Sequence, residues 1–246
     1  MEMVLVAVNF LSMFFALAAA AQEKSETDTI KTSAGDLKIT FLGHGSLYFT
    51  FGGKVIHVDP YSAVADYSKL PKADIILLAH EHQDHLDLKA LNLVRTDKTI
   101  VVLPQVCAKQ VEGGVVLDNG ATTVLGGVRI DAVAAYNIVN KRADSGQPYH
   151  PKGVGNGYIL TFGDKRIYVA GDTENIPEIK AIKNIEVAFL PMNLPYTMTP
   201  EMVADAAKTI KPKILYPYHF GETDTSKLVA LLKDTKEIEV RIRKMK

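Results

Sequence analysis

Short blocks of hydrophobic residues, many of them alternating with polar residues, recur along the chain and indicate β-strands. In the first half, strands are predicted over residues 36–41, 46–51, 54–58, 74–79 and 99–103, with further strands within 114–134. Gly52-Gly53 predicts a tight hairpin turn between two of them. The run at 75–79 is continuously apolar, as expected of a strand covered on both faces. The first half is therefore expected to be a β-layer with one short helix over residues 86–94.

The second half repeats the pattern of the first. The segment TFGGKVIHV at residues 50–58 matches TFGDKRIYV at residues 161–169, with Thr, Phe, Gly, Lys, Ile and Val in register. Each segment precedes an aspartate, Asp59 or Asp172, and then a second apolar strand. β-Hairpins in general resemble one another, which is the simpler explanation of the match. The shared order of elements favours two similar β-rich halves packed as a pseudo-symmetric pair.

Helical signals are concentrated late in the second half. Thr199, Pro200 and Glu201 predict a helix start, with a capping hydroxyl, proline at the first helical position and an early acid. Pro212 is expected to end this helix. The remaining predicted elements are a short helix over residues 177–183, an amphipathic helix over 225–232, and strands over 213–218 and 237–243.

The N-terminus differs in composition from the rest of the chain. Residues 3–21 are apolar and end in Ala19-Ala20-Ala21, which is typical of a secretory signal peptide over residues 1–21. No Lys or Arg precedes the apolar run, so a membrane-anchoring helix is the alternative. We expect cleavage, a polar leader over residues 22–36, a folded domain over residues 37–246, and a periplasmic or secreted protein without stable membrane association.

The composition limits the kinds of partner. The 246 residues include 28 basic and 28 acidic residues, so the formal net charge is +0, and 47% of the residues are hydrophobic. Such a composition is ordinary for a globular α/β protein and provides no basic excess for a long nucleic acid, so a small-molecule substrate is expected. The single cysteine, Cys107, excludes an internal disulfide and a cysteine-rich zinc site.

Four potential metal ligands directly follow the apolar run at 75–79. They are His80, His82, Asp84 and His85, within the segment LLAHEHQDHLD. Alternate side chains of a strand share a face, so His80 and His82 can point the same way, and the turn that follows can bring Asp84 and His85 to a neighbouring position. Imidazole and carboxylate ligands suit zinc, iron or manganese. This density of ligands predicts a site for two divalent metal ions.

Three further candidate ligands lie at the ends of predicted strands. His150 stands in a polar loop just before a strand, Asp172 ends the strand RIYVAGD, and His219 ends the strand KILYPYH. Active sites of layered α/β proteins gather at such element edges. Taken alone, Asp172 is better explained as an ordinary turn residue, but its position after the repeated hairpin, together with the ligand cluster at 80–85, favours a role in the site.

The motifs HEHQDH (80–85), GDT (171–173) and YHFG (218–221) resemble the metallo-β-lactamase superfamily. The segments FLGHGSLYF, VDPY, HPKGVGNGYIL and LPYTMTPEMVADAAKTIKPK are similar to its UlaG-like branch, which is related to L-ascorbate-6-phosphate lactonase and to other metal-dependent hydrolases. The resemblance covers about residues 37–221. It implies an α/β fold in four layers, an αββα sandwich, which agrees with the two predicted halves.

The same resemblance implies a division of ligands between two metal ions, zinc in the first instance, with manganese or iron as alternatives. One ion would be held by His80, His82 and His150 and the other by Asp84, His85 and His219, with Asp172 bridging them. Asp59 would orient a ligating imidazole. Asp84 and His44 are the candidate catalytic residues, since Asp84 can orient a water and His44 either lines the cleft or, as the alternative, is a structural histidine. His57 is expected to be structural.

The walls of the cleft are less well specified. The residues expected to contact substrate are Tyr149, Lys152, Asn193, Tyr196 and Thr197. The loop at 136–153 also carries Lys141 and Arg142, which can either bind an anionic group such as phosphate or form a solvated charged loop.

The expected reaction is hydrolysis by a metal-activated hydroxide. No Gly-x-Ser-x-Gly, Walker or dinucleotide-binding motif is present in the sequence. We expect a metal-dependent hydrolase acting on a small ester, lactone or amide. The alternatives are a phosphodiesterase of the same fold and a relative that binds metal without catalysis.

Overall fold

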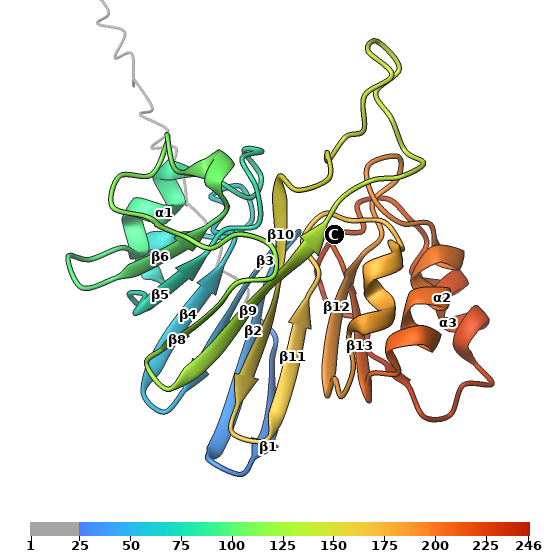
Figure 1. Ribbon diagram of the computed structural model, residues 1–246. Coiled ribbons are helices and arrows are strands. Elements are labelled where there is room, and N and C mark those ends of the chain that lie inside the picture. The colour runs from blue at the N-terminus through green and yellow to red at the C-terminus, as the bar shows by residue number, and fades with distance from the viewer. Residues whose placement is uncertain (1–24) are drawn as a thin grey trace, which may run out of the picture.

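Two seven-stranded sheets, each with helices on its outer side, build the computed structural model, which describes residues 25–246 (Figure 1). The first sheet has the order β1-β2-β3-β4-β5-β6-β7, with the bounds Thr27–Thr32, Gly35–Gly43, Ser46–Phe51, Lys54–Val58, Ile75–Leu77, Ile100–Leu103 and Val115–Val116. The second has the order β14-β13-β12-β11-β10-β9-β8. In chain order its strands β8 to β14 cover Thr122–Leu125, Val128–Ala135, Gly155–Phe162, Lys165–Val169, Val187–Pro191, Ile214–Tyr218 and Glu239–Val240.

The two sheets have the same pairing pattern. In the first sheet β1 to β4 pair antiparallel and β4 to β7 pair parallel. In the second sheet β8 to β11 pair antiparallel and β11 to β14 pair parallel. The repeated hairpins have equivalent registers, since Phe51 opposes Lys54 and Phe162 opposes Lys165. The four-layer α/β sandwich of two pseudo-symmetric halves is therefore confirmed.

The strand β5 shows why the sheets are buried on both faces. Ile75 and Leu77 point into the core between the sheets, whereas Ile76 and Leu78 pack in the outer core together with Leu91 of the helix α1 (Leu88–Val94). Side chains alternate across a strand, so an unbroken apolar run supplies both cores at once.

Aromatic contacts join the two sheets across the inner core. The rings of Phe49 and Phe162 lie 5.4 Å apart, and those of Phe41 and Phe189 lie 6.2 Å apart. Each pair takes one ring from each sheet, so burial of large apolar surface holds the halves together.

The helices of the second half begin as predicted. The hydroxyl of Thr199 accepts a hydrogen bond from the backbone N–H of Met202 and caps α2 (Pro200–Ile210), with Pro200 at the first position. The helix ends at Lys211, whose φ of 55° is left-handed, one residue before Pro212. The helix α3 covers Thr225–Leu232. Three short 3-10 helices, η1 to η3, cover Tyr67–Lys69, Gln105–Cys107 and Pro177–Ala181.

Two predictions of elements were wrong. Residues 27–36 are not a leader, because β1 pairs with β2, buries Ile30 and places Asp28 within 2.7 Å of the Arg243 guanidinium. The final strand is limited to Glu239–Val240. The predicted signal peptide over residues 1–21 lies outside the described residues. Within residues 25–246, no helix combines the length and the apolar character needed to cross a bilayer.

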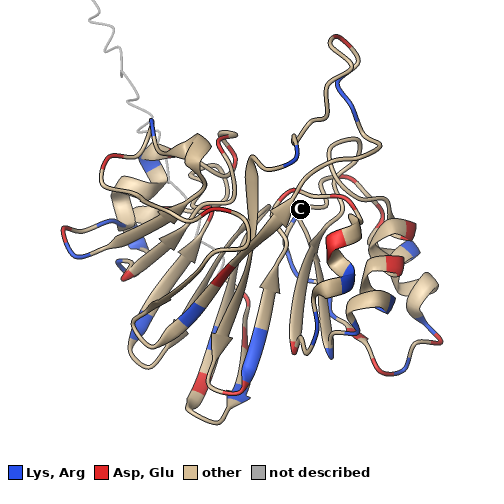
Figure 2. Cartoon of the chain, viewed as in Figure 1, with Lys and Arg blue, Asp and Glu red and all other residues tan. Residues whose placement is uncertain are grey.

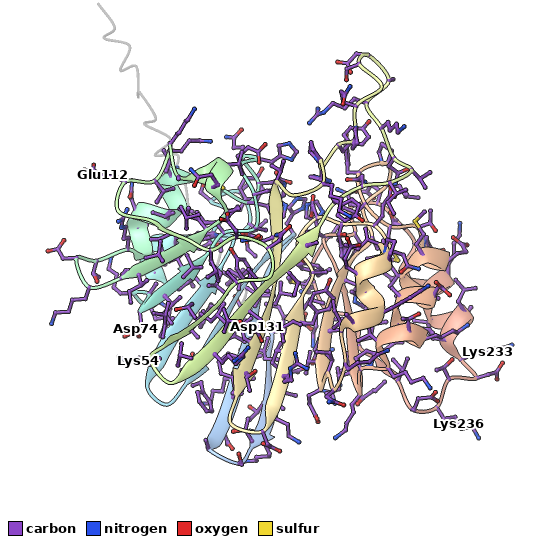
Figure 3. The ribbon with its side chains drawn as sticks, in the orientation of Figure 1. Lys54, Asp74, Glu112, Asp131, Lys233 and Lys236 are labelled. Atoms are coloured by element: carbon purple, nitrogen blue, oxygen red, sulfur yellow. The ribbon has the colours of Figure 1, made fainter. Side chains whose placement is uncertain are left out.

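Charged side chains are interspersed over both layers (Figure 2). Most of the ion pairs lie on the surface, such as that between Lys54 and Asp74, whose Nζ and Oδ1 atoms are 2.8 Å apart (Figure 3). Such pairs contribute little to stability. Apart from His57, the buried charged and imidazole groups lie instead at one end of the sandwich.

Candidate metal centre

The parallel strands of both sheets end at the same edge of the sandwich, and four of these strands are followed within a few residues by a candidate ligand or its support. Asp59 follows β4, His80 follows β5, Asp172 follows β11 and His219 follows β13. The carboxyl ends of parallel strands form the usual binding edge of an α/β sheet. The fold therefore brings residues far apart in sequence to one place.

Three histidines form the first group of potential ligands. His80, His82 and His150 each offer one ring nitrogen, and these three nitrogens lie within 4.8 Å of one another. Nε2 of His80 lies 2.9 Å from Nδ1 of His82. His150 is oriented by Asn137, whose Oδ1 lies 2.6 Å from Nδ1 of the ring and also accepts the backbone N–H of His150. A proton on that Nδ1 leaves Nε2 available to a metal.

The carboxylates lie beside this group. Oδ1 of Asp172 is 3.5 Å from Nε2 of His85, and its Oδ2 is 3.3 Å from Nε2 of His150. His80, His85 and Asp172 form a second group of potential ligands. Nδ1 of His85 is 2.8 Å from Oδ2 of Asp59, which also accepts the backbone N–H of Ala79 through Oδ1. Asp59 is placed to orient His85, as the resemblance implies.

The third group contains Asp84, His219 and His44. Oδ2 of Asp84 lies 2.9 Å from Nε2 of His44 and 3.3 Å from Nε2 of His219. The structure thus brings together all seven residues that the resemblance implies as metal ligands. It also places His44 among the potential ligands of this group rather than only on the wall of the cleft.

These residues fit a metal. Nε2 of His85 and Oδ1 of Asp172 are buried and have no hydrogen-bond partner among the described residues. A buried polar atom without a partner is costly, and a cation between these atoms would satisfy both. The donor set of imidazole nitrogen and carboxylate oxygen suits zinc, iron or manganese.

The protonation states agree with metal binding at several positions. Burial lowers the pKa of His80 well below its ordinary value, and it lowers the pKa of His150 to about 4. Both rings are therefore neutral and able to donate an electron pair to a metal at pH 7. Burial would raise the pKa of Asp172, but the nearby His219 and His85 outweigh it and hold that pKa well below its ordinary value.

The protonation states of His85 and Asp84 are determined by neighbouring side chains. Burial disfavours a charged His85, but the Asp172 and Asp59 carboxylates outweigh this effect and raise the pKa of His85 well above its ordinary value. Hydrogen bonds from His219 and His44 outweigh the burial of Asp84 and lower its pKa. Asp84 is therefore a carboxylate at neutral pH, and a cation bound at the site would take the place of the His85 proton.

The backbone around the site is strained. His44, Asp59 and His219 have φ angles of 53°, 43° and 46°, in the left-handed region that residues other than glycine seldom adopt. Such strain concentrates where the surrounding structure must hold a functional geometry. Next to His44, a Cβ on Gly45 would stand 3.1 Å from Cε1 of His85, so the small residue lets the loop approach that ring.

A cavity of about 530 Å³ lies over these ligands. It is lined by His44, Tyr61, His82, Gln83, Asp84, Arg142, Tyr149, His150, Asp172, Asn193, Tyr196 and His219. Three of the residues expected to contact substrate therefore reach it, namely Tyr149, Asn193 and Tyr196.

The other two expected contacts are corrected. Lys152 lines a different cavity, where its ammonium donates hydrogen bonds to Glu178 and to the hydroxyl of Tyr136. Thr197 is buried, and its hydroxyl accepts the backbone N–H of Asn193. Thr197 fixes the turn that carries Asn193 and does not line the cavity.

Two further residues shape the site without a signal in the sequence. Asn137 binds His150 and also donates to the backbone oxygen of Tyr196. Glu174 is buried, and its carboxylate accepts the backbone N–H groups of three consecutive residues, 138–140. Their roles depend on the backbone of a distant loop, which no local pattern discloses.

Comparison with known proteins agrees with this geometry. A family profile described as "Beta-lactamase superfamily domain" matches residues 38–219. A UPF0173 metal-dependent hydrolase from Geobacillus sp. (strain WCH70) is 31% identical over 215 residues, which are 80% of this chain and 94% of that protein.

Solved structures extend the similarity to the fold. A crystal structure from Parabacteroides distasonis, provisionally assigned as a metal-dependent hydrolase, shares 48% identity and a TM-score of 0.86, covering 90% of this chain and 100% of that one. The metallo hydrolase Igni18 from Ignicoccus hospitalis shares the fold with 24% identity and a TM-score of 0.71, covering 85% of this chain and 95% of that one.

Proposed function

The chain belongs to the beta-lactamase superfamily of metal-dependent hydrolases, and on this premise we propose that it hydrolyses a small ester, lactone or amide at a two-metal centre. The observation that carries the proposal is the convergence of seven potential ligands beneath an open cavity, five of which line it, and which include buried atoms without a hydrogen-bond partner among the described residues. A volume of about 530 Å³ is in the range of small-molecule sites.

Bound divalent metals would supply Lewis-acid activation of water and of the substrate carbonyl. The residues of the chain orient the water and the substrate and transfer protons. Asp84 is a carboxylate that faces the cavity and can accept a hydrogen bond from the attacking water. His44 lies 2.9 Å from Asp84 and lines the same cavity, so it is placed to pass a proton to the leaving group.

A phosphodiesterase of the same fold is the second candidate. Arg142 favours it, because this cation lines the cavity and suits phosphate. The interspersed surface charges in Figure 2 favour a small diester over a long nucleic acid. A relative that binds metal without catalysis would show ligation and no turnover.

The experiment combines metal analysis with a substrate panel. Elemental analysis of the purified protein should find stoichiometric transition metal, and lactones, β-lactams and bis(p-nitrophenyl) phosphate should be tested on zinc- and manganese-loaded protein. We expect cleavage of a lactone or amide. Cleavage of the phosphate diester alone would select the second candidate, and the absence of bound metal would refute the central claim.

Asp172→Asn is the variant that tests the site itself. The side chain keeps its size but loses the charge that two groups of ligands share, so we expect loss of metal and at least about a 100-fold loss of activity. Asp131→Asn is the matched control, since Asp131 lies on β9 and pairs with Arg129 at the surface (Figure 3). Metal content that is equal in the two variants would contradict the assignment.

We further propose that zinc occupies the centre and that the protein is exported after cleavage behind Ala21. Zinc is favoured by the number of histidines, since imidazole suits this ion. Export is favoured by the apolar N-terminal segment of the sequence. Intact mass of the protein recovered from the periplasm or medium tests the second statement, because retention of residues 1–21 would contradict it.

A further inference from the structure

Arg142 stands on a loop that projects over the cavity. The loop joins β9 to β10 and rises above the sandwich in Figure 1. A bridge between Lys141 and Pro148 and a hydrogen bond from the N–H of Arg142 to the oxygen of Gln147 give it hairpin form. The base of the loop is held by the buried Glu174 carboxylate. The Glu174 carboxylate thus anchors the loop two residues before Arg142.

The guanidinium of Arg142 has little to neutralise it. Among the residues of the described part of the chain, it is the single Lys or Arg that lines the cavity, and it forms no ion pair with any of them. Its contacts are the ring of Tyr149, whose centroid is 5.3 Å from Cζ, and Nε2 of His82, which is 3.3 Å from Nη2. The Tyr149 ring in turn packs edge-on against Tyr196 at 4.9 Å.

The contact with His82 depends on which ring nitrogen carries the proton. A guanidinium only donates, so Nε2 of His82 must accept and the proton must lie on Nδ1. That same Nδ1 is the nitrogen that lies beside His80 in the first group of ligands. If Nδ1 holds a metal, the neutral ring carries its proton on Nε2, and two donors then face each other. A metal held by Nδ1 would therefore leave the Arg142 guanidinium without this acceptor.

From this arrangement we propose that Arg142 is the binding site for an anionic group of the substrate, a carboxylate or a phosphate. The inference rests on the proposed hydrolase function and specifies its substrate class. The planar donors of the guanidinium match the two oxygens of either group, and the Tyr149 and Tyr196 rings line the same wall of the cavity. The scissile group then lies over Asp84, at the floor, with the anion at the rim.

Binding of two simple anions tests the subsite without turnover. Succinate and inorganic phosphate are titrated by calorimetry into zinc-loaded wild type, Arg142→Gln and Lys141→Gln. Lys141 is the matched control, since it is the neighbouring cation on the same loop and does not line the cavity. We expect Arg142→Gln to weaken the binding of at least one anion about 10- to 100-fold, because a charge-assisted hydrogen-bond donor is lost. Lys141→Gln should change the affinity for neither anion by more than about twofold.

The comparison of the two anions identifies the group. A larger loss of affinity for succinate indicates that the substrate group is a carboxylate, and a larger loss for phosphate indicates that it is a phosphate. Arg142→Lys should recover only part of the affinity, because an ammonium lacks the two-pronged geometry. If Arg142→Gln binds both anions as tightly as wild type, or if wild type binds neither, the subsite is refuted. If Arg142→Gln weakens anion binding equally in zinc-loaded and in chelator-treated protein, metal binding does not release Arg142 from His82.

Kinetics separate this inference from the proposed function. p-Nitrophenyl acetate and the mono-p-nitrophenyl ester of succinate carry the same leaving group and differ in the anion. We expect Arg142→Gln to lower kcat/KM about 10-fold or more for the succinate ester and less than about twofold for the acetate. Equal losses for both esters would overturn the subsite while hydrolysis stands. Cleavage of neither ester by wild type, with Arg142-dependent anion binding retained, would overturn ester hydrolysis alone.

Discussion

His57 is a buried histidine that takes no part in the ligand cluster. Nε2 of His57 lies 3.0 Å from the backbone oxygen of Pro71, and the ring stacks on Tyr48 with a centroid distance of 5.0 Å. Burial lowers the pKa of His57 to about 4. The structural role predicted for His57 thus has a consequence for stability, because the ring must remain neutral in the folded protein.

We predict that His57 makes the fold acid-sensitive between about pH 6.5 and pH 4. The unfolded chain binds a proton at His57 below pH 6.5, whereas the folded protein binds it only below about pH 4. The unfolded state therefore gains protons first, and the free energy of unfolding falls as the pH falls through this window. The difference of roughly 2.5 pKa units corresponds to about 3 kcal/mol.

The variant His57→Gln isolates this contribution. Glutamine can still donate to Pro71 but does not titrate, so its free energy of unfolding should fall about 3 kcal/mol less than that of wild type between pH 7 and pH 4. Urea denaturation at several pH values measures the two curves. Parallel curves would show that His57 is accessible to protons in the folded protein.

At the level of single residues, the candidate metal ligands were easier to predict from the sequence than the residues that hold them in place. His80, His82, Asp84 and His85 are dense enough to be recognised in one segment. The resemblance then identified Asp59, Asp172 and His219, which each follow a strand, and His150, which stands in the loop before β10. Asn137 and Glu174 act through hydrogen bonds to backbone atoms that fold over them, and the direction of Lys152 depends on the path of its loop.

At the scale of elements, the loop from β9 to β10 depends on one carboxylate. Glu174 accepts the N–H groups of Ile138, Val139 and Asn140 at 2.8, 2.7 and 2.6 Å, and the amide of Asn137 at 3.1 Å. Hydrogen bonds to a buried carboxylate are strong, and unsatisfied donors are costly. The loop therefore stays close to His150 although its tip is exposed.

We predict that Glu174→Gln loosens this loop. A glutamine removes the charge and turns an N–H group toward backbone donors, so we expect the free energy of unfolding to fall by about 2–3 kcal/mol. Hydrogen exchange at residues 138–140 should rise selectively. The control is Glu178→Gln, an exposed partner of Lys152 whose loss should cost less than about 1 kcal/mol. Unchanged protection of residues 138–140 from hydrogen exchange in Glu174→Gln would contradict the role of Glu174 in holding the loop.

The elements themselves were largely predictable, for reasons that differ between strands. The hairpin strands β3 and β4 were located to the residue, because glycines with φ of 56° and 77° mark the turn and apolar alternation marks the strands. The strand β1 was missed because TDTIKT buries only Ile30 and holds its place by pairing with β2. An edge strand of this kind has no strong hydrophobic signal.

At the scale of the whole molecule, the candidate ligands connect the two halves. His80, His82, Asp84 and His85 come from the first half, whereas His150, Asp172 and His219 come from the second. The inner core already joins the halves, with Phe49 against Phe162. A metal at this edge would add a second link at the end of the sandwich, where like-charged or proton-binding groups would otherwise be confined together.

We predict that removal of metal lowers the stability of the whole protein in a single cooperative step. A ligand that binds only the folded state stabilises it by about 4 kcal/mol at a thousandfold excess over its Kd, and the ligands here are assembled only when both halves are folded. Chelator treatment should therefore lower the Tm by several degrees, with one transition before and after, because one core spans both sheets. The variant Asp172→Asn should have a Tm that does not respond to chelator. Two separate transitions in chelator-treated wild type would mean that the halves fold independently and that metal, rather than the core, joins them.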